Sequence, residues 1–249
     1  MPRLSAVIIT KNEAANIADC LDSVAFSDER IVVDSGSSDE TVRIAKEKGA
    51  RVEQHEFTGY GAQKNFALSL AQGDWVLSVD ADERVSPALV AEIERTIAGG
   101  HADGYRMPRR STFCGRVMRH SGWWPDYVLR LFRRGRARFS DDIVHERVIC
   151  DGPIERLAEP LDHVAVRRIE DSLSRMDRYS TAGAELIVAS GRRPSFMTGI
   201  THGIFAFFKT YVLRAGFLDG REGFLLAVAI AEGSYYRHMK AWLRGRDRG

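Results

Sequence analysis

The stretch WVLSVDADE, residues 75–83, places two aspartates directly after an apolar run. The run from Trp75 to Val79 predicts a buried strand, and Asp80, Ala81 and Asp82 follow it at once. Two carboxylates in a strand-end loop can ligate a divalent cation such as Mg²⁺ or Mn²⁺, which in turn binds a diphosphate. An acidic pair at such a place is also a common turn or helix cap, so the pair alone leaves both interpretations open.

The residues before this stretch alternate apolar runs with amphipathic ones. The apolar runs predict strands over residues 4–9, 30–33 and 51–55, and the amphipathic runs predict helices over residues 14–24, 37–48 and 62–71. Ser37 and Glu40 have the spacing of a capping box, and Gly49 suits a left-handed helix end. Four such units predict an α/β fold with a mostly parallel, doubly wound sheet flanked by helices, in which ligands bind beyond the carboxyl ends of the strands.

The pattern changes from about Tyr105, where short strand-like pieces are separated by Gly, Pro and Arg. Two of these pieces cover residues 128–132 and 144–149, and we expect them to form the mixed-strand second half of the same domain. Beyond Glu170, helical spacing over residues 172–189, 196–215 and 222–243 predicts an all-helical appendage. We therefore expect one domain over residues 1–169 and a helical region over residues 170–249.

Composition excludes several other classes of protein. The 249 residues are 44% hydrophobic and 28% charged, as in a folded water-soluble protein, and 36 basic against 34 acidic residues give a net charge of +2, which indicates no global polyanion partner. Cys20, Cys114 and Cys150 form no CxxC pair, so we expect neither a zinc knuckle nor a disulfide framework. No signal peptide and no long apolar span is recognisable, and we expect a cytoplasmic location.

Polar residues also follow the first two predicted strands. Asp34 comes before a turn containing Gly36, and its carboxylate can accept a hydrogen bond from a uracil imide or a sugar hydroxyl, or can simply cap the turn. Thr10, Asn12 and Glu13 follow the first strand and face the same predicted cleft, although Asn12 can also cap the next helix.

Lys64 and Asn65 lie at the start of the helix predicted over residues 62–71. An ammonium group beside the positive end of a helix favours a phosphate. A solvated lysine is the alternative interpretation for Lys64.

These motifs together resemble the family 2 glycosyltransferases, which have the GT-A fold. The matching segments are IITKNEAANI (8–17), VVDSGSSDETV (32–42), GAQKNFAL (61–68) and LSVDADE (77–83). The elements Gln63-Lys64-Asn65 and Val144-His145-Glu146 resemble especially the bacterial lipopolysaccharide-core glucosyltransferases of the WaaE (KdtX) type.

The resemblance implies a UDP-sugar donor lying across the first four strand ends, with a divalent metal. It implies that Asp34 contacts the nucleobase, Asp80 the ribose side, and Asp82 the metal and diphosphate. The other residues expected to bind the nucleotide sugar are Thr10, Asn12, Glu13, Gly36, Lys64, Asn65 and Ala81. Residues 1–104 would then bind the donor, and residues 105–169 would hold the acceptor and the catalytic base.

Transfer with inversion requires a general base that takes a proton from the acceptor hydroxyl, on the side opposite the leaving group. Many relatives supply it from a Glu-Asp motif, of which this chain has no clear copy; it offers Asp141, Asp142, His145 and Glu146. We predict Glu146 as the base, with Asp142 as the alternative. His145 would complete the metal shell or orient the acceptor. In a strand Glu146 and His145 point to opposite faces, so both cannot line the cleft equally.

Ten arginines between residues 106 and 138 make the middle of the chain locally basic. Trp123 and Trp124 lie among them and resemble a sugar-stacking platform beside phosphate-binding side chains. We predict that Trp123, Trp124 and Arg130 bind the acceptor, and a phosphorylated glycolipid suits both features. Nucleic acid is not expected, because no recognition helix precedes this block.

The C-terminal helices carry apolar faces with cations at intervals, including Lys209, Arg214, Arg221, Arg237 and Lys240. This pattern suits helices lying on an anionic leaflet. Packing against the catalytic domain or against a second subunit explains the apolar faces equally well. Glu222 and Glu232 interrupt the apolar stretch and argue against a membrane span. We expect a peripheral protein on the inner face of the cytoplasmic membrane.

The function predicted from the sequence is metal-dependent, inverting transfer of a hexose, glucose from UDP-glucose, to a lipopolysaccharide inner-core heptose or a related glycolipid. Another cell-envelope polysaccharide or lipid acceptor is the nearest alternative. A non-catalytic module that binds a nucleotide sugar and recruits partners to a membrane is an alternative of a different class. An aspartyl phosphohydrolase is disfavoured, because its acidic pair usually follows the first strand with Thr or Val after it, whereas Glu83 and Arg84 follow here.

Overall fold

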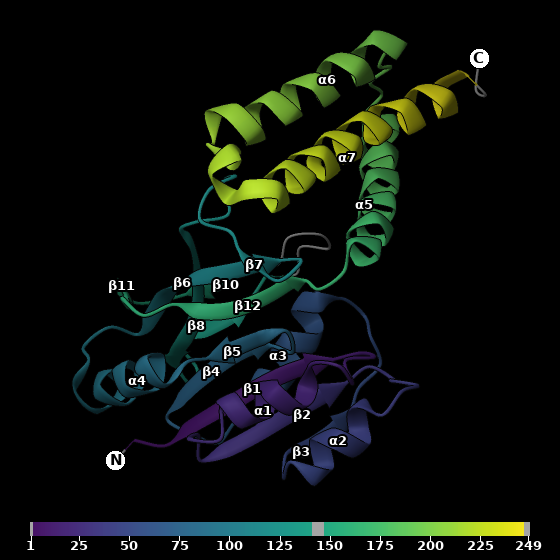
Figure 1. The fold of residues 1–249 in the computed structure, drawn as a ribbon. Coiled ribbons are helices and arrows are strands. Elements are labelled where there is room, and N and C mark those ends of the chain that lie inside the picture. The colour runs from purple at the N-terminus through teal and green to yellow at the C-terminus, as the bar shows by residue number, and fades with distance from the viewer. Residues whose placement is uncertain (1, 141–146, 247–249) are drawn as a thin grey trace. The chain divides into compact units, whose positions relative to one another are not determined.

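The computed structural model describes residues 2–140 and 147–246. These residues form a mixed α/β fold followed by long C-terminal helices, which confirms the predicted fold class (Figure 1). The contacts of the chain group it into two compact units. The sheet unit contains residues 1–109 and 126–163, and the helical unit contains residues 110–125 and 164–249.

The first half of the sheet unit is parallel. Its strands are β1 (Leu4–Thr10), β2 (Glu29–Asp34), β3 (Arg51–Gln54) and β4 (Trp75–Asp80), in the order β3-β2-β1-β4, and they are connected by helices α1 (Ile17–Ser23), α2 (Thr41–Glu47) and α3 (Tyr60–Leu70). All these elements were expected from the apolar periodicity. The register pairs Thr10 with Asp34 and Ile9 with Asp80, so the polar residues that end these strands come together at one edge.

The second half of the sheet unit is mixed, as expected. Its elements are β5 (Glu83–Val85), α4 (Pro87–Gly99), β6 (Gly104–Phe113), β8 (Asp126–Arg133), β9 (Ala137–Phe139), β10 (Val148–Cys150), β11 (Ile154–Arg156) and β12 (Leu161–Val166). Strand β8 runs antiparallel to both β4 and β6, and β12 runs antiparallel to β5. Strands β9 and β10 form a separate antiparallel pair. This arrangement places β8 and β5 next to the end of β4.

Both faces of the parallel strands are covered by helices. Alternate side chains of β1 enter two different hydrophobic clusters: Ala6 and Ile8 pack with α1 and α4, whereas Val7 packs with Ala67 of α3. A strand covered on both faces has no polar face. This is why β1 reads as a nearly continuous apolar run.

The start of helix α2 differs from the prediction. The helix begins at Thr41, and no side chain caps it at Glu40, so the expected Ser37–Glu40 capping box is wrong. Ser37 instead donates its hydroxyl to Asp34 and accepts the Asn12 N–H at 2.8 Å. Competition from the buried Asp34 carboxylate therefore overrides the local capping pattern. The predicted helix end is present, because Gly49 adopts a positive φ of 75°.

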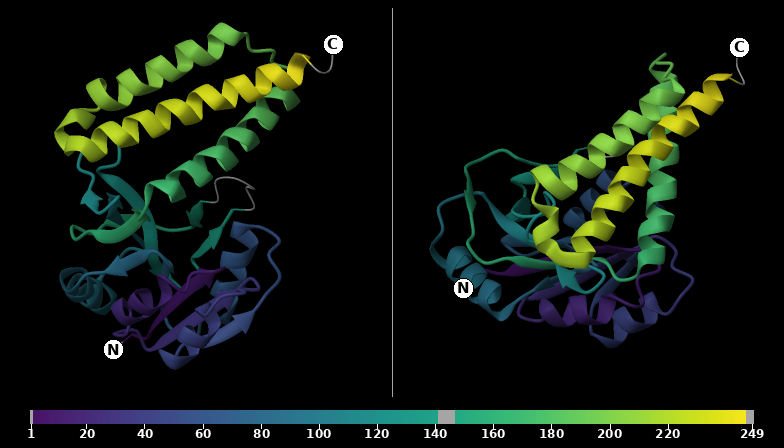
Figure 2. Two further views of the ribbon diagram at one scale, coloured as in Figure 1. Left: turned by 45° about the vertical axis from the view of Figure 1, so that its right-hand side comes forward. Right: turned by 45° about the horizontal axis from the view of Figure 1, so that its top comes forward.

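The helical unit contains the three long helices expected from the sequence: α5 (Ile169–Ala189), α6 (Phe196–Phe208) and α7 (Gly220–Arg246). A π-turn, η1 (Lys209–Leu213), and a 3₁₀ turn, η2 (Gly216–Asp219), connect α6 to α7. Helix α7 packs against both α5 and α6 (Figure 2). Gly203 permits the close approach of α6 and α7, because a Cβ there would lie 3.2 Å from the Tyr235 Cβ. No helix of residues 2–140 and 147–246 combines the length and the apolar composition that crossing a bilayer requires.

Residues 110–125, which carry the short strand β7 (Arg116–Val117), belong to the helical unit, although the sequence placed its boundary near residue 170. Asp219, at the end of η2, is almost completely buried and accepts the N–H groups of Arg119 and His120, both at 3.0 Å, and the Ser121 hydroxyl at 3.0 Å. A buried carboxylate needs such donors to offset its desolvation. Asp219 thus ties this loop to residues about 100 positions away in the chain.

The environment of Cys20 predicts an unreactive thiol. Cys20 of α1 is fully buried in the core, and burial raises the pKa of its thiol to about 12. Because the thiolate is the reactive form, iodoacetamide at about pH 8 should alkylate the half-buried Cys150 in the native protein, Cys114 more slowly because burial also raises the pKa of its thiol, and Cys20 only after denaturation. Peptide mapping by mass spectrometry measures this. Alkylation of Cys20 in the folded protein would contradict its placement in the core.

Candidate active site

The carboxyl end of β4 carries a cluster of buried charges. The Asp80 carboxylate lies 3.0 Å from the Lys64 ammonium of α3 and accepts a short hydrogen bond from the Arg130 guanidinium of β8. Lys64 and Arg130 are both almost completely buried. The structure thus brings Asp80 and Lys64 together, as predicted, but it makes them direct partners of each other.

The two cations control the protonation of Asp80. Burial by itself raises the pKa of this carboxyl, but the charges of Arg130 and Lys64 and their hydrogen bonds more than compensate, so its pKa lies well below the usual value. Burial likewise opposes the charge of Arg130, and the carboxylates of Asp80 and Glu83 raise its pKa above the usual value. Both groups are therefore charged at neutral pH, and each stabilises the charge of the other.

Glu83 is a member of this cluster that the sequence analysis missed. It is fully buried; one carboxylate oxygen accepts the Asp80 N–H at 2.9 Å, and the other accepts from Arg130 at 2.7 Å and lies 3.6 Å from Arg109. Glu83 therefore holds both the backbone and the cationic partner of Asp80. One feature of the sequence could have identified Glu83: it lies in a short segment with the apolar Val85, which predicts that the segment is buried. A buried glutamate needs a cationic partner.

The structure gives Arg130, a predicted acceptor-binding residue, two carboxylate partners, and its contact with an acceptor stays a prediction. Its guanidinium is buried and bonded to Asp80 and Glu83, so it forms part of the strand-end cluster and presents no exposed cation. Trp123 and Trp124 belong to the helical unit and not to the unit that holds Asp80. Trp124 is partly exposed, and Trp123 contacts Phe113 edge to face.

Asp82 has different partners from Asp80. Both side chains are partly exposed, and one carboxylate oxygen of Asp82 lies 3.4 Å from the His163 Nε2. His163 lies opposite Glu83 in the antiparallel register of β12 and β5. The sequence contains no local sign of this pair, because the two residues are 81 positions apart in the chain. Arg84 stabilises the loop between β4 and β5, because its guanidinium donates a hydrogen bond to the Ala81 carbonyl at 2.8 Å.

A divalent cation fits Asp82 better than Asp80. A carboxylate oxygen and an imidazole nitrogen facing each other are suitable donors for Mn²⁺ and acceptable ones for Mg²⁺. The Asp80 oxygens are already bonded to two cations, which opposes the addition of a third. Among residues 2–140 and 147–246, no three His, Cys, Asp or Glu side chains are grouped as a complete metal shell. Asp82 and His163 are therefore the described residues that could hold the ion.

Asp34 organises the loop after β2. It is fully buried, and its carboxylate accepts the N–H groups of Gly36 and Ser37 at 2.9 and 2.8 Å and the Thr10 hydroxyl at 3.0 Å. Gly36 adopts a positive φ of 79°, which allows this turn. These bonds support the turn-capping alternative, and the contact with a nucleobase stays a prediction.

Three other predicted nucleotide contacts also make structural hydrogen bonds. Asn12 accepts the Ser38 N–H at 2.8 Å, and the Glu13 carboxylate accepts from Asn16 at 2.7 Å. The Asn65 amide bonds both the N–H and the carbonyl of Phe139, at 2.8 and 2.9 Å, which attaches α3 to β9. These side chains therefore shape the strand ends, and their contacts with a nucleotide stay predictions.

The predicted base and the third metal ligand lie outside the described residues. These are Glu146, with Asp142 as its alternative and Asp141 beside it, and His145.

Comparison with known proteins identifies the family. The model of glycosyl transferase family 2 matches residues 5–157. An uncharacterized glycosyltransferase of Rickettsia felis is 34% identical over 96% of this chain and 89% of its own length. The lipopolysaccharide core biosynthesis glycosyltransferase LpsC of Rhizobium meliloti is 31% identical over 94% of this chain and 93% of its own length. Glucosyl-3-phosphoglycerate synthase of Mycobacterium tuberculosis is 28% identical over 44% of each chain, with a TM-score of 0.40.

The chain belongs to glycosyltransferase family 2. This confirms the resemblance found in the four sequence motifs. It also confirms that the protein is an enzyme of the glycosyltransferase class and not a phosphohydrolase.

The buried cluster predicts unequal effects of two arginine substitutions. Arg130→Met removes the cation shared by two carboxylates, and we expect the free energy of unfolding to fall by about 3–5 kcal/mol. Arg43→Met, which removes an exposed arginine paired with Glu40 and Glu47, should change it far less, because solvent screens both ion pairs. Urea denaturation followed by circular dichroism compares the two. Similar losses in both variants would show that the cluster is not specially important for stability.

The lowered pKa of Asp80 predicts a dependence of stability on pH. Because the folded-state pKa lies below the unfolded value of about 3.9, Asp80 contributes stability that is complete above about pH 5 and is lost as the pH falls through that range. Asp80→Asn should therefore be less stable than the wild type at neutral pH, and its stability should fall less steeply on acidification. Denaturation curves at several pH values measure this, and equal slopes would contradict it.

Proposed function

We propose that this glycosyltransferase transfers a hexose, glucose from UDP-glucose, with inversion and with the help of a divalent metal, to a lipopolysaccharide inner-core heptose or a related glycolipid. The observation that carries the proposal is the meeting of Asp80, Asp82, Lys64 and His163 at the carboxyl ends of the strands. Ligands bind at this edge in open α/β sheets. The lipopolysaccharide-core name of the relative LpsC supports the acceptor class. Another cell-envelope polysaccharide or lipid is the alternative acceptor.

Each aspartate of the strand-end loop has a separate task in this proposal. Asp80, kept ionised by Lys64 and Arg130, accepts hydrogen bonds from the ribose side of the donor. Asp82 and His163 hold the metal, which when bound supplies positive charge that favours departure of the diphosphate. Glu83 positions this loop through the Asp80 N–H. The remaining donor contacts proposed are Thr10, Asn12, Glu13, Asp34, Gly36, Asn65 and Ala81.

The transfer step needs one further carboxylate, and we assign it to Glu146, with Asp142 as the alternative. This base removes the proton from the acceptor hydroxyl while the hydroxyl oxygen forms a bond to the anomeric carbon. The bond from the anomeric carbon to the diphosphate oxygen breaks on the opposite side, and UDP leaves with its electron pair. The configuration at the anomeric carbon is therefore inverted. Trp123 and Trp124 are kept as proposed acceptor contacts.

Exposed apolar side chains of the helical unit favour peripheral binding to the inner face of the cytoplasmic membrane. They gather around the connection between α6 and α7: Ile204, Phe208, Val212, Leu213, Phe217, Leu218 and Leu225. Leu213 and Ile204 are 62% and 67% exposed. Lys209, Arg214 and Arg221 lie in the same segment and suit anionic lipid head groups.

Substitution of Asp82 tests the proposed metal site. Asp82→Ala should abolish transfer and metal-dependent binding of UDP, and His163→Ala should weaken both, because each loses one proposed ligand of the cation. The matched control is Asp22→Ala, which removes an exposed carboxylate paired with Lys48 and should keep the wild-type activity. Circular dichroism checks that all three variants fold. Unchanged transfer by Asp82→Ala would remove the argument for a metal at this loop.

A panel of donors distinguishes this proposal from a non-catalytic binding module. The protein is incubated with UDP-, GDP- and dTDP-sugars and Mn²⁺, and release of the sugar is followed by chromatography. Sugar release from UDP-glucose is the expected result. Binding of a nucleotide sugar without turnover, also in the presence of a heptose-containing acceptor, would support the recruitment module instead.

A further inference from the structure

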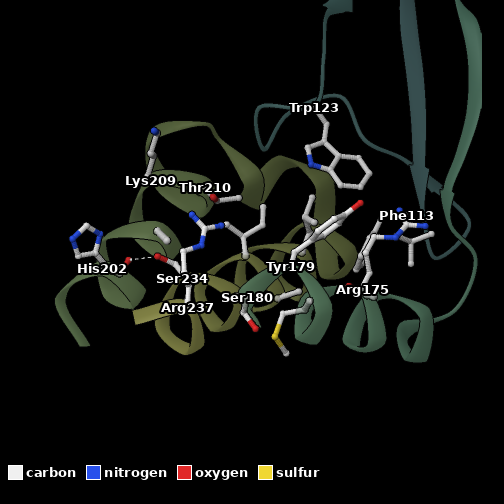
Figure 3. A pocket seen from close by; sticks show the side chains of 18 of the residues that line it. Phe113, Trp123, Arg175, Tyr179, Ser180, His202, Lys209, Thr210, Ser234 and Arg237 are labelled. Atoms are coloured by element: carbon white, nitrogen blue, oxygen red, sulfur yellow. Dashed lines mark hydrogen bonds between the residues drawn. The ribbon is translucent and has the colours of Figure 1, made fainter. Parts of the chain in front are cut away.

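The helical unit contains a cavity of its own, with a volume of about 520 Å³. Its walls come from α5, α6, η1, α7 and the segment around Phe113 and Trp123, all within the helical unit (Figure 3). This volume lies within the range of about 300–1,000 Å³ typical of pockets for small molecules. The cavity contains none of the sheet-unit residues assigned to sugar transfer, and of the residues assigned to the acceptor it includes only Trp123, so its cationic side chains need a separate explanation.

Four cationic side chains line this cavity: Arg175, Lys209, Arg214 and Arg237. No aspartate or glutamate is among the lining residues. Within the part of the chain that the structure describes, none of the four forms an ion pair; Arg175 donates to the Ala165 carbonyl at 3.1 Å. Lys209, Arg214 and Arg237 are exposed, so a ligand can reach them from solvent. This concentration of uncompensated positive charge is complementary to an anionic group such as a phosphate.

The cavity also has an extensive apolar wall. Figure 3 shows His202, Lys209, Thr210, Ser234 and Arg237 on one side, and Phe113, Trp123 and Tyr179, together with Arg175, on the other. Met176, Phe205, Leu226 and Ile230 add further apolar surface. A free phosphate would use the cations and leave this wall in contact with water. A ligand that combines an anionic group with a hydrocarbon chain would use both parts.

We propose that this cavity binds a phosphorylated lipid, with the phosphate among Lys209, Arg214 and Arg237 and the acyl chain along the wall formed by Trp123 and Tyr179. The proposal concerns the helical unit alone and does not depend on which sugar is transferred. It adds a site for a single lipid molecule to the general attraction that exposed apolar residues have for a membrane. Lipid bound here would hold the helical unit at the surface from which a lipid acceptor is taken.

The test uses the full chain and a lysophosphatidic acid whose acyl chain carries two bromine atoms, kept below its micellar concentration. Bromine quenches tryptophan fluorescence on contact, and Trp123 lines the cavity. We expect saturable quenching in the wild type and clearly less of it in Trp123→Phe. The double variant Lys209→Gln/Arg237→Gln should bind the brominated lipid at least about tenfold more weakly, because it loses the hydrogen bonds that the two cations donate to the phosphate.

The matched control is Arg192→Gln/Arg193→Gln, which removes two exposed cations of the α5–α6 connection outside the cavity and should bind like the wild type. If the Lys209 and Arg237 double variant does not fold, Lys209→Gln alone replaces it, because this side chain is exposed. Equal weakening in the two double variants would overturn the proposal. So would equal binding of a brominated monoacylglycerol, which lacks the phosphate, or competition by inorganic phosphate as effective as that of unbrominated lysophosphatidic acid.

Discussion

The compensation of charge around Asp80 is the constraint on which the strand-end site depends. Lys64, Arg130 and Glu83 are buried charges, which are tolerated only when opposite charges and hydrogen-bond partners replace the water that they lose. Here Lys64 comes from α3 and Arg130 from β8, and Glu83 binds both Arg130 and the Asp80 N–H. These contacts join elements on both sides of β4. The same bonds that make the buried charge possible therefore also fix where the strand-end loop lies.

The two aspartates of one tripeptide consequently differ in their chemistry. Asp80 is bonded to two cations, whereas Asp82 faces His163. In the function proposed above, this division gives an anionic donor both a fixed acceptor of hydrogen bonds at Asp80 and a place for added positive charge at Asp82. The loop after β2 shows a third arrangement, in which Asp34 is bonded by its own turn.

The helical unit uses buried and exposed charge in different ways. The Asp219 carboxylate is buried, and hydrogen bonds from residues 119–121 compensate its negative charge. These bonds attach residues 110–125 to the helices of this unit. The cations around the cavity are left without ion-pair partners among the described residues, next to apolar walls. The first arrangement stabilises the fold. The second leaves surface suited to an anionic amphiphile, in keeping with the exposed apolar side chains between α6 and α7.

The amino-acid sequence by itself determined the order and type of the elements up to residue 80 and of the C-terminal helices, because periodicities of two and 3.6 residues are local. It also showed the strand-end position of Asp80 and Asp82. Only the tertiary structure decided the partners of those residues. Arg130 lies 50 positions from Asp80, and His163 lies 81 positions from Asp82; strand order and register bring them together. Local patterns do not contain this information, because the free energy of a buried charge depends on groups that are distant in the chain.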